Sequence, residues 1–306
     1  MTPLYKDAAK GPFYHIAIIA LLGVGISAIP LDKLFGLFIA DEKTALCLAQ
    51  TVIRYIISAA AIITAVKYGF NKEFSFRKGV KGYIITLPAL IVAINNFPFV
   101  ALFTGGLTPD YEGNYIILYI FYCLSIGLYE ELVFRGLIFP LCLSVTENKK
   151  HGVFWAVALN AAIFGGIHII NLFGGASIPA TVLQVGYSFL IGAMCAISFS
   201  VTGNVFVAVI LHATYDIGGL AMSEFGIFNG FQWDTLTVVL TAVLGVAVTA
   251  YMTVITFKLN AEQVKIKILG EKFVTAEKAE IKSAKESERN DSRSENAESD
   301  ENRNDR

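Results

Sequence analysis

The stretch YIILYIFYCLSIGLYEELVFRGLIFPLCL, residues 115–143, has the composition of a membrane-spanning helix but contains two adjacent acidic residues, Glu130 and Glu131. An acidic side chain at the centre of a membrane helix costs roughly 2.5–3.5 kcal/mol on insertion scales. Such residues are retained where partner groups or water compensate for their charge, and they usually serve chemistry or transport. The stretch therefore predicts a helix of a membrane protein that contributes to a functional site.

The composition of the whole chain is that of a polytopic membrane protein. It has 306 residues, of which 55% are hydrophobic and only 16% are charged, and its mean hydropathy is +0.60. Soluble domains are nearer to a quarter charged. The four cysteines form no C-x-x-C pair, so they indicate small buried side chains and neither a disulfide framework nor a zinc ribbon.

Eight apolar segments approach the roughly 20 residues that a transmembrane helix needs. The sequence thus predicts an all-α, polytopic membrane helical bundle of about eight transmembrane helices. No internal repeat is evident, and the inverted halves of many transporters are not visible. The predicted spans are Phe13–Ile29, Ala45–Val66, Gly82–Phe103, Tyr115–Leu143, Gly152–Ile170, Pro179–Ser200, Asn204–Met222 and Thr235–Phe257.

The charges of the loops predict the orientation in the membrane. The segment between the second and third spans contains five basic residues, whereas the loops 104–114, 171–178 and 223–234 contain none. The first loop, with Lys33 and Lys43, is the exception. Because cytoplasmic loops are enriched in Lys and Arg, both termini are expected in the cytoplasm of a multi-pass protein of the cell membrane.

Two parts of the chain differ in composition. Residues 1–257 are expected to form the transmembrane helical domain, and residues 258–306 a charged cytoplasmic tail. From about residue 276 the tail has almost no aliphatic side chains, which predicts disorder. Before that point, Lys258, Lys265 and Lys267 alternate with apolar residues, a pattern that suggests a short amphipathic helix on the membrane surface.

The acidic pair is followed by Arg135, four residues after Glu131. Residues four apart share a helix face, so Arg135 is expected to neutralise Glu131. Glu130 points about 100° away from its neighbour and is left for another role. A buried ion pair that only holds helices together is the alternative, but it leaves Glu130 without a partner.

Two later apolar segments contain further titratable residues. His168 lies in NAAIFGGIHIINLF, one turn after Phe164 on the same helix face. His212 and Asp216 lie four residues apart in NVFVAVILHATYDIGG. A carboxylate at this spacing holds an imidazole in one tautomer, or both groups face a shared site.

The order E-E-x-x-x-R, F-x-x-x-H and H-x-x-x-(N or D) on three apolar helices resembles the CAAX protease and bacteriocin-processing (CPBP) family of intramembrane proteases. That family includes type II CAAX prenyl endopeptidases and bacteriocin self-immunity proteins. The matching text is YEELVFRGLIF, FGGIH and LHATYD. The resemblance covers residues 115–219, which would be the protease-like core, while the other spans match only as membrane helices.

The resemblance implies an intramembrane endopeptidase that acts on a membrane-associated or lipidated peptide or protein. It implies that Glu130 is the general base for a water molecule and that His168 helps to hold this water. His212 and Asp216 fall where family members with Asn are thought to stabilise the oxyanion. Glu131 and Arg135 would be supporting residues of this catalytic site.

Asp216 departs from the Asn form of the third motif, and an ionised carboxylate would repel an oxyanion. Either Asp216 is protonated, or it orients His212, which then supplies the hydrogen-bond donor. We favour the second interpretation.

Other interpretations remain open at the level of sequence. Glu130, His168 and His212 could also hold a zinc ion as a cofactor, because Glu and His are zinc ligands. No H-E-x-x-H motif supports such a zinc site. A proton-coupled carrier, or a catalytically idle membrane partner or immunity protein, would use the same residue types. The lipid bilayer is an expected partner and nucleic acid is not.

The predicted spans place the candidate site residues at different depths in the membrane. At about 1.5 Å per residue, Glu130 and His168 fall roughly 20–25 Å from the cytoplasmic ends of their spans, and His212 roughly 12–14 Å. A shared site therefore requires tilted helices or different helix ends.

Overall fold

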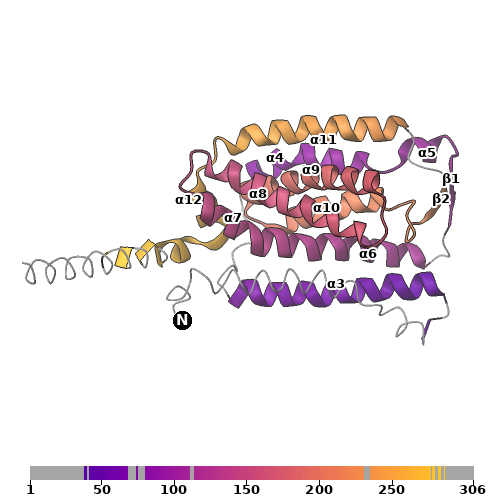
Figure 1. Ribbon diagram of the computed structural model, residues 1–306, viewed down its shortest axis with the longest axis horizontal. Coiled ribbons are helices and arrows are strands. Elements are labelled where there is room, and N and C mark those ends of the chain that lie inside the picture. The colour runs from indigo at the N-terminus through magenta and orange to yellow at the C-terminus, as the bar shows by residue number, and fades with distance from the viewer. Residues whose placement is uncertain are drawn as a thin grey trace, which may run out of the picture.

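A computed structural model describes residues 38–39, 41–67, 74, 80–110, 114–230, 235–276, 278–279, 282–283 and 286. The described residues form a bundle of helices with one small pair of strands (Figure 1). The predicted first span, Phe13–Ile29, lies outside the described residues, as does most of the tail whose disorder was predicted.

The helices of the bundle follow the predicted spans closely. In chain order the elements are α3 (Glu42–Lys67), α4 (Val80–Asn95), α5 (Phe99–Phe103), β1 (Leu107–Pro109), α6 (Tyr115–Glu131), the π-helix η2 (Leu132–Ile138), α7 (Phe139–Thr146), α8 (Gly152–Ile167), the 3-10 helix η3 (His168–Leu172), α9 (Ile178–Thr202), α10 (Val205–Gly219), β2 (Phe228–Gly230), α11 (Thr235–Thr256) and α12 (Ala261–Leu269).

Five helical segments are long and apolar enough to cross a membrane, namely Glu42–Lys67, Tyr115–Thr146, Gly152–Leu172, Ile178–Thr202 and Thr235–Thr256. Two further apolar helices, α4 and α10, are shorter. The predicted all-α membrane bundle is therefore confirmed. The number of crossings and the side on which each terminus lies remain predictions.

The helices differ in how deeply they lie in the bundle. α3 runs along α6 on one side and α11 runs along the opposite side, with α8, α9 and α10 between them (Figure 1). In the most apolar 18-residue stretch of α11, 17% of the residues are buried, whereas in that of α9 56% are buried. The exposed side chains of α11 are mostly aliphatic, so this helix faces lipid while α9 fills the centre.

Two glycines allow helices of the core to cross in backbone contact. A Cβ atom at Gly127 would lie 2.9 Å from the amide nitrogen of Ala213, so α6 and α10 touch without an intervening side chain. A Cβ at Gly165 would lie 2.9 Å from the carbonyl of Val185 on α9. Small residues permit such approaches in membrane bundles. The first crossing brings the end of α6 beside the middle of α10.

The two strands join loops that are far apart in the sequence. β1 pairs antiparallel with β2, and Leu107 is opposite Gly230. Both strands belong to predicted loops that lack Lys and Arg. Their pairing at one end of the bundle agrees with the expectation that these loops lie on the same side of the membrane (Figure 1).

The apolar face of the amphipathic helix α12, which the sequence suggested would contact a membrane surface, packs against the bundle. Val264 and Ile268 are buried in the main hydrophobic core. Lys265 is only 3% exposed and pairs with Glu147 at the end of α7, with 2.9 Å between Nζ and Oε2. The apolar face of α12 is thus covered by the end of the bundle, which offers it both an apolar surface and a carboxylate.

The packing at this end of the bundle explains why the predicted spans placed His212 at a different depth from Glu130 and His168. α9 ends at Thr202, and the turn to α10 is buried at Asn204 and Val205. The Nζ atom of Lys267 on α12 donates to the carbonyl of Val201 at 2.9 Å. α10 therefore starts beneath α12, inside the bundle, so His212 lies deeper than a span that starts at the surface would put it.

Candidate active site

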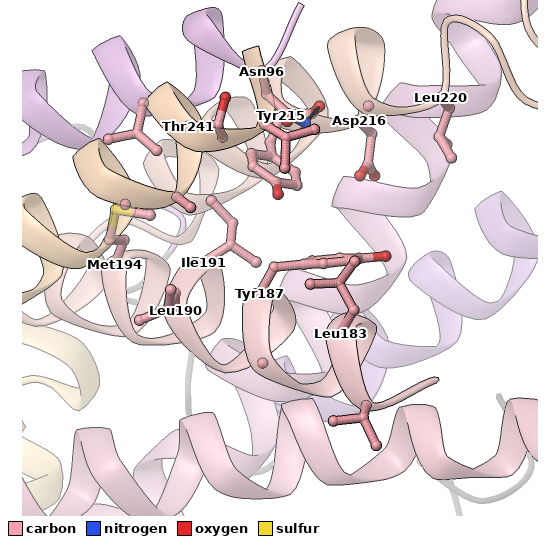
Figure 2. Close-up of a pocket in the computed structure, with 17 residues that line it drawn as sticks. Asn96, Leu183, Tyr187, Leu190, Ile191, Met194, Tyr215, Asp216, Leu220 and Thr241 are labelled. Carbon is pink, nitrogen blue, oxygen red and sulfur yellow. Dashed lines mark hydrogen bonds between the residues drawn. The ribbon is translucent and has the colours of Figure 1, made fainter. Parts of the chain in front are cut away.

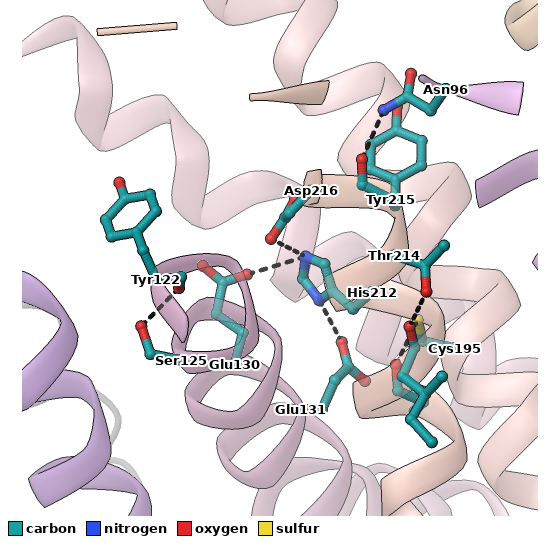
Figure 3. A network of polar contacts seen from close by, with 12 residues as sticks. Asn96, Tyr122, Ser125, Glu130, Glu131, Cys195, His212, Thr214, Tyr215 and Asp216 are labelled. Atoms are coloured by element: carbon teal, nitrogen blue, oxygen red, sulfur yellow. Dashed lines mark hydrogen bonds and ion pairs between the residues drawn. The ribbon is translucent and has the colours of Figure 1, made fainter. Parts of the chain in front are cut away.

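Glu131 joins the first and third sequence motifs. Its Oε1 atom lies 3.0 Å from Nη1 of Arg135 and 2.7 Å from Nδ1 of His212. The side chains of Glu131 and Arg135 have no exposed surface. The predicted ion pair between Glu131 and Arg135 is confirmed, and the same carboxylate also holds the imidazole (Figure 3).

A π-helical turn carries Arg135. Helix α6 passes directly into η2, in which the hydrogen bonds are wider than in an α-helix. Such turns are rare and are frequent at functional sites. The carbonyl of Phe134 accepts a hydrogen bond from Nδ2 of Asn160 on α8, 2.9 Å away. A side chain of another helix thus supplies a donor to the backbone of this turn.

Arg135 is held by two further contacts. Its Nη2 atom donates to the carbonyl of Gly192 on α9 at 2.8 Å. Its guanidinium lies 4.6 Å from the ring centroid of Phe164 on α8, a cation–π distance. A Cβ at Gly192 would lie 2.8 Å from Cδ1 of Phe164. The small residue at this position leaves room for the arginine and the ring side by side.

The other nitrogen of His212 faces two carboxylates. Nε2 lies 3.7 Å from Oε2 of Glu130 and 3.7 Å from Oδ2 of Asp216. The side chains of Glu130 and Asp216 are 22% and 14% exposed, so this side of the ring is accessible (Figure 3). Polar atoms separated by more than 3.5 Å are often bridged by water. The arrangement suits a water molecule among the three groups.

The role that we favoured for Asp216, to orient His212, is performed by another residue in the structure. The short hydrogen bond that fixes the orientation of His212 comes from Glu131, at 2.7 Å, whereas Asp216 is 3.7 Å from the opposite nitrogen. The four-residue spacing within α10 was the basis of the prediction. Glu131 takes that position because the crossing at Gly127 brings α6 closer to His212 than the next turn of α10 is.

His168 lies one ring away from this cluster. Its Nδ1 atom donates to the carbonyl of Phe164 at 2.9 Å, which leaves Nε2 without a proton in the neutral ring. The ring of Phe164 makes T-shaped contacts with His168, at 5.3 Å, and with His212, at 5.7 Å. The ring of Phe164 therefore contacts both histidines. Within the described part of the chain, no ion pair joins His168 to Glu130 or Asp216.

The alternative zinc ligand set is not assembled. Glu130 and His212 approach each other, whereas the contacts of His168 in the described part of the chain are with Phe164, through its ring and its carbonyl. The residues that the structure describes contain no group of three His, Cys, Asp or Glu side chains arranged to hold a metal ion. We therefore derive no role for a metal from these three residues.

A cavity of about 690 Å³ opens beside Asp216. Its walls come from α4, α9, α10 and α11 and are mostly aliphatic. Figure 2 shows Asp216 and Tyr187 towards one end of the cavity and Met194 towards the other. The lipid-facing helix α11 forms part of the wall, so an apolar group of a membrane molecule has a binding surface next to the carboxylate.

Two side chains that were not among the predicted site residues hold the end of α10 in place. Nδ2 of Asn96 donates to the carbonyl of Tyr215 at 2.9 Å, and the hydroxyl of Tyr119 donates to the carbonyl of Ile217 at 2.7 Å. Both hold the end of α10 on either side of Asp216. An asparagine in an apolar span is the signal for such a contact, whereas nothing in the sequence marks Tyr119.

Comparison with known proteins gives one match. The model of the family described as type II CAAX prenyl endopeptidase Rce1-like matches residues 112–218, about a third of the chain. No curated protein and no solved structure matches the chain significantly. The matched segment contains Glu130, Glu131 and His212 of the cluster and also His168. The family predicted from the three motifs is thus confirmed over residues 112–218, the segment of this integral membrane protein that matches the Rce1-like type II CAAX prenyl endopeptidases.

Proposed function

We propose that the protein is an intramembrane endopeptidase in which Glu130 activates a water molecule to hydrolyse a peptide bond. The observation that carries this proposal is the contrast between the two adjacent glutamates. Glu131 is buried and bound by Arg135 and His212, while Glu130 is partly exposed and faces Nε2 of His212 at 3.7 Å. The family match supports a peptide hydrolase.

The attacking water is bound between the carboxylates of Glu130 and Asp216, each of which is 3.7 Å from Nε2 of His212. Glu130 accepts one proton of this water as it attacks the carbonyl carbon of the substrate, which is general-base catalysis. Asp216 holds the second hydrogen of the same water, since its Oδ2 atom is buried and makes no hydrogen bond to the described residues. The proton on Glu130 is then given to the amine of the leaving peptide.

His212 stabilises the negative charge that develops on the carbonyl oxygen. Its Nδ1 atom donates to Glu131, so a protonated ring presents Nε2–H to the open side of the cluster. A buried carboxylate beside an imidazole favours this charged form and fixes its orientation. Donors that are oriented before the reaction are among the largest contributions to catalysis of acyl transfer.

His168, whose ring contacts Phe164, contacts the substrate or the attacking water. Its free Nε2 atom is an acceptor in the neutral ring, because Nδ1 donates to the carbonyl of Phe164. This role follows the family resemblance, and it requires the substrate to bridge the two histidines. We expect His168 to contribute less than Glu130.

The substrate is a peptide attached to, or inserted in, the membrane. The cavity of about 690 Å³ beside Asp216 has walls fit for an aliphatic chain or an apolar peptide segment. Occupancy of this cavity would hold the adjacent peptide bond near Glu130 and Asp216. Such an anchored substrate gains reactivity from positioning, since the cavity fixes its orientation relative to the catalytic groups.

Cleavage by the purified protein in lipid vesicles tests this function. Farnesylated peptides and membrane-anchored leader peptides are supplied to the wild type, Glu130→Gln and the control Glu224→Gln, in which an exposed glutamate is changed. We expect cleavage by the wild type and the control, and a loss of about 10²–10⁴-fold in Glu130→Gln. Comparative proteomics of cells with the wild type or Glu130→Gln identifies natural substrates as uncleaved peptides. Equal cleavage by all three proteins, or none by any, contradicts the proposal.

A further inference from the structure

A second cavity lies at the end of the bundle that is opposite to the strands β1 and β2. It has a volume of about 430 Å³ and is found where α4 begins and where α9 and α11 end. Helix α12 completes its wall, and Figure 1 shows α12 and the end of α11 at this end of the bundle. Among the described residues that line the cavity there is no member of the catalytic cluster, so the proposed function leaves this cavity unexplained.

Two lysines from different helices line this cavity. Lys81 belongs to the first turn of α4, and Lys267 belongs to the last turn of α12. Lys81 is exposed, and no ion pair between described residues involves it. The described part of the wall contains no carboxylate. The cavity therefore offers a hollow with two cations, which suits an anionic ligand.

A glycine and a carbonyl hold Lys267 in place. Its Nζ atom donates to the carbonyl of Val201 at 2.9 Å. Its side chain crosses Gly203, where a Cβ atom would lie 2.5 Å from Cγ of the lysine and where φ is +68°. Both the close approach and the left-handed backbone require glycine. An ammonium group has three N–H donors, so Lys267 can bind this carbonyl and an oxygen of a ligand together.

The carbonyl of Val201 also brings the two lysines to one place. A Cβ atom at Gly82 would lie 2.8 Å from this carbonyl oxygen, so the first turn of α4 packs directly on the end of α9. Lys81 precedes this contact by one residue, and Lys267 binds the same oxygen. A lysine that only capped the end of α9 would explain Lys267. It would not explain a second lysine beside a hollow.

The rest of the wall is largely aliphatic and leads to the surface that faces lipid. Ile85 of α4, Ile255 of α11 and Leu259 contribute to it. A stripe of exposed aliphatic side chains starts beside Lys81 and follows α4 for about 21 Å, at 1.5 Å per residue. This length exceeds half of the hydrocarbon core, about 15 Å, so the stripe can cover an acyl chain. The stripe consists of Val80, Ile84, Leu87, Ile91 and Ile94.

We propose that this cavity binds the phosphate of an anionic phospholipid, whose acyl chains lie along α4 and α11. Phosphate oxygens accept strong, charge-assisted hydrogen bonds from lysine. Both lysines are near helix ends, where a membrane helix meets the headgroups, and basic pockets between membrane helices bind such headgroups. A free phosphate ion would use the two lysines but not the aliphatic stripe. The combination of cations and stripe therefore favours a lipid.

Native mass spectrometry of the purified protein in a neutral detergent tests the proposal. Dioleoyl phosphatidic acid and dioleoyl phosphatidylcholine have the same chains and differ in headgroup charge. One lysine near an anionic lipid strengthens binding about fivefold, so we expect the wild type to bind phosphatidic acid about 20–30-fold more tightly. Lys81→Gln should lower this preference about fivefold. Lys149→Gln, at an exposed lysine of the same end of the bundle but outside the cavity, is the matched control and should keep the preference.

Three outcomes overturn the inference. Equal binding of both lipids by the wild type shows that there is no anion site. Equal losses in Lys81→Gln and Lys149→Gln show a general attraction to a basic surface. Displacement of the lipid by inorganic phosphate at the same concentration shows that the ligand is a soluble phosphate.

Crosslinking locates the bound lipid. A diazirine in the acyl chain of phosphatidic acid should label α4 and α11 in the wild type, and Lys81→Glu should lose this labelling. Labelling confined to other helices contradicts the proposal. Both experiments measure lipid binding and not cleavage, so their results do not depend on whether the protein is a protease.

Discussion

The two sides of His212 are built differently. On the Nδ1 side, Glu131 and Arg135 are fully buried, and hydrogen bonds, an ion pair and the ring of Phe164 hold them. On the Nε2 side, Glu130 and Asp216 are partly exposed, and each is 3.7 Å from the ring. One side is closed and the other has room for water. We infer that the closed side positions the imidazole and that the open side carries the chemistry.

This difference separates two neighbouring residues of one helix. Glu130 and Glu131 have the same side chain at adjacent positions, but the 100° rotation between them puts one in the core and the other at the site. Stability should therefore depend mainly on the closed side and activity on both. The following substitutions test that division, beginning with the largest expected effect.

Removing the charge of Arg135 breaks the closed side. Arg135→Met removes one of the two groups that bind the buried carboxylate of Glu131, and the loss of one partner of a buried ion pair typically costs 3–5 kcal/mol. We expect a loss of this size in the free energy of unfolding, measured by denaturant titration in bicelles. Lys43→Met, at the exposed end of α3, is the control and should lose less than about 1 kcal/mol. An unchanged stability of Arg135→Met would mean that the ion pair does not hold the site.

Filling the space at Gly192 disturbs the closed side without removing a charge. In Gly192→Ala the new methyl group collides with Phe164 and comes close to Arg135, so we expect a loss of about 1–3 kcal/mol. Gly186→Ala, on the same helix, meets no atom within 4 Å and is the matched control. Thermal unfolding of both variants in detergent measures the difference. If the two variants unfold at the same temperature, the packing around Arg135 is looser than described.

Asn160 tests whether the π-helical turn needs its hydrogen bond. Asn160→Ala leaves the carbonyl of Phe134 without the donor at 2.9 Å, so about 1–2 kcal/mol of stability should be lost. Asn160→Asp supplies no amide donor and should not restore it. Hydrogen exchange of the segment Leu132–Ile138 follows the turn itself and should become faster. Unaltered exchange in both variants argues that the turn is stable without α8.

Two substitutions of Asp216 test which property of this side chain the open side of His212 requires. Asp216→Asn retains a group that binds water or an oxyanion, so activity should remain within about tenfold of the wild type. Asp216→Leu removes the group that holds the attacking water beside Glu130, and kcat should fall by about 10²-fold. Initial rates in vesicles give both values. A loss in Asp216→Asn as large as in Asp216→Leu would show that the negative charge itself is required.

Much of the bundle could be predicted from the sequence because spans need length and apolarity, which composition reveals. The ends of α9 and α10 were harder, since α12 covers them and allows α10 to begin inside the protein. The position of α12 itself depends on the buried pair of Lys265 and Glu147, which are 118 residues apart. No local pattern of charge and apolarity identifies such a distant partner.

Within the site, the ion pair of Glu131 and Arg135 could be predicted because it lies within one helix. The bond from Glu131 to His212 could not, because it depends on the backbone contact at Gly127 between α6 and α10. The π-helical turn and the role of Gly192 likewise depend on tertiary packing.

The most direct test of the account is a parallel measurement on Glu130→Gln and Glu131→Gln, in which kcat and the free energy of unfolding are determined on the same preparations. We predict that Glu130→Gln loses at least about 10²-fold in kcat while its stability stays within about 0.5 kcal/mol of the wild type. Glu131→Gln should lose several kcal/mol of stability together with activity. A stable, active Glu131→Gln beside an unfolded Glu130→Gln would contradict the assignment of the closed and open sides of His212.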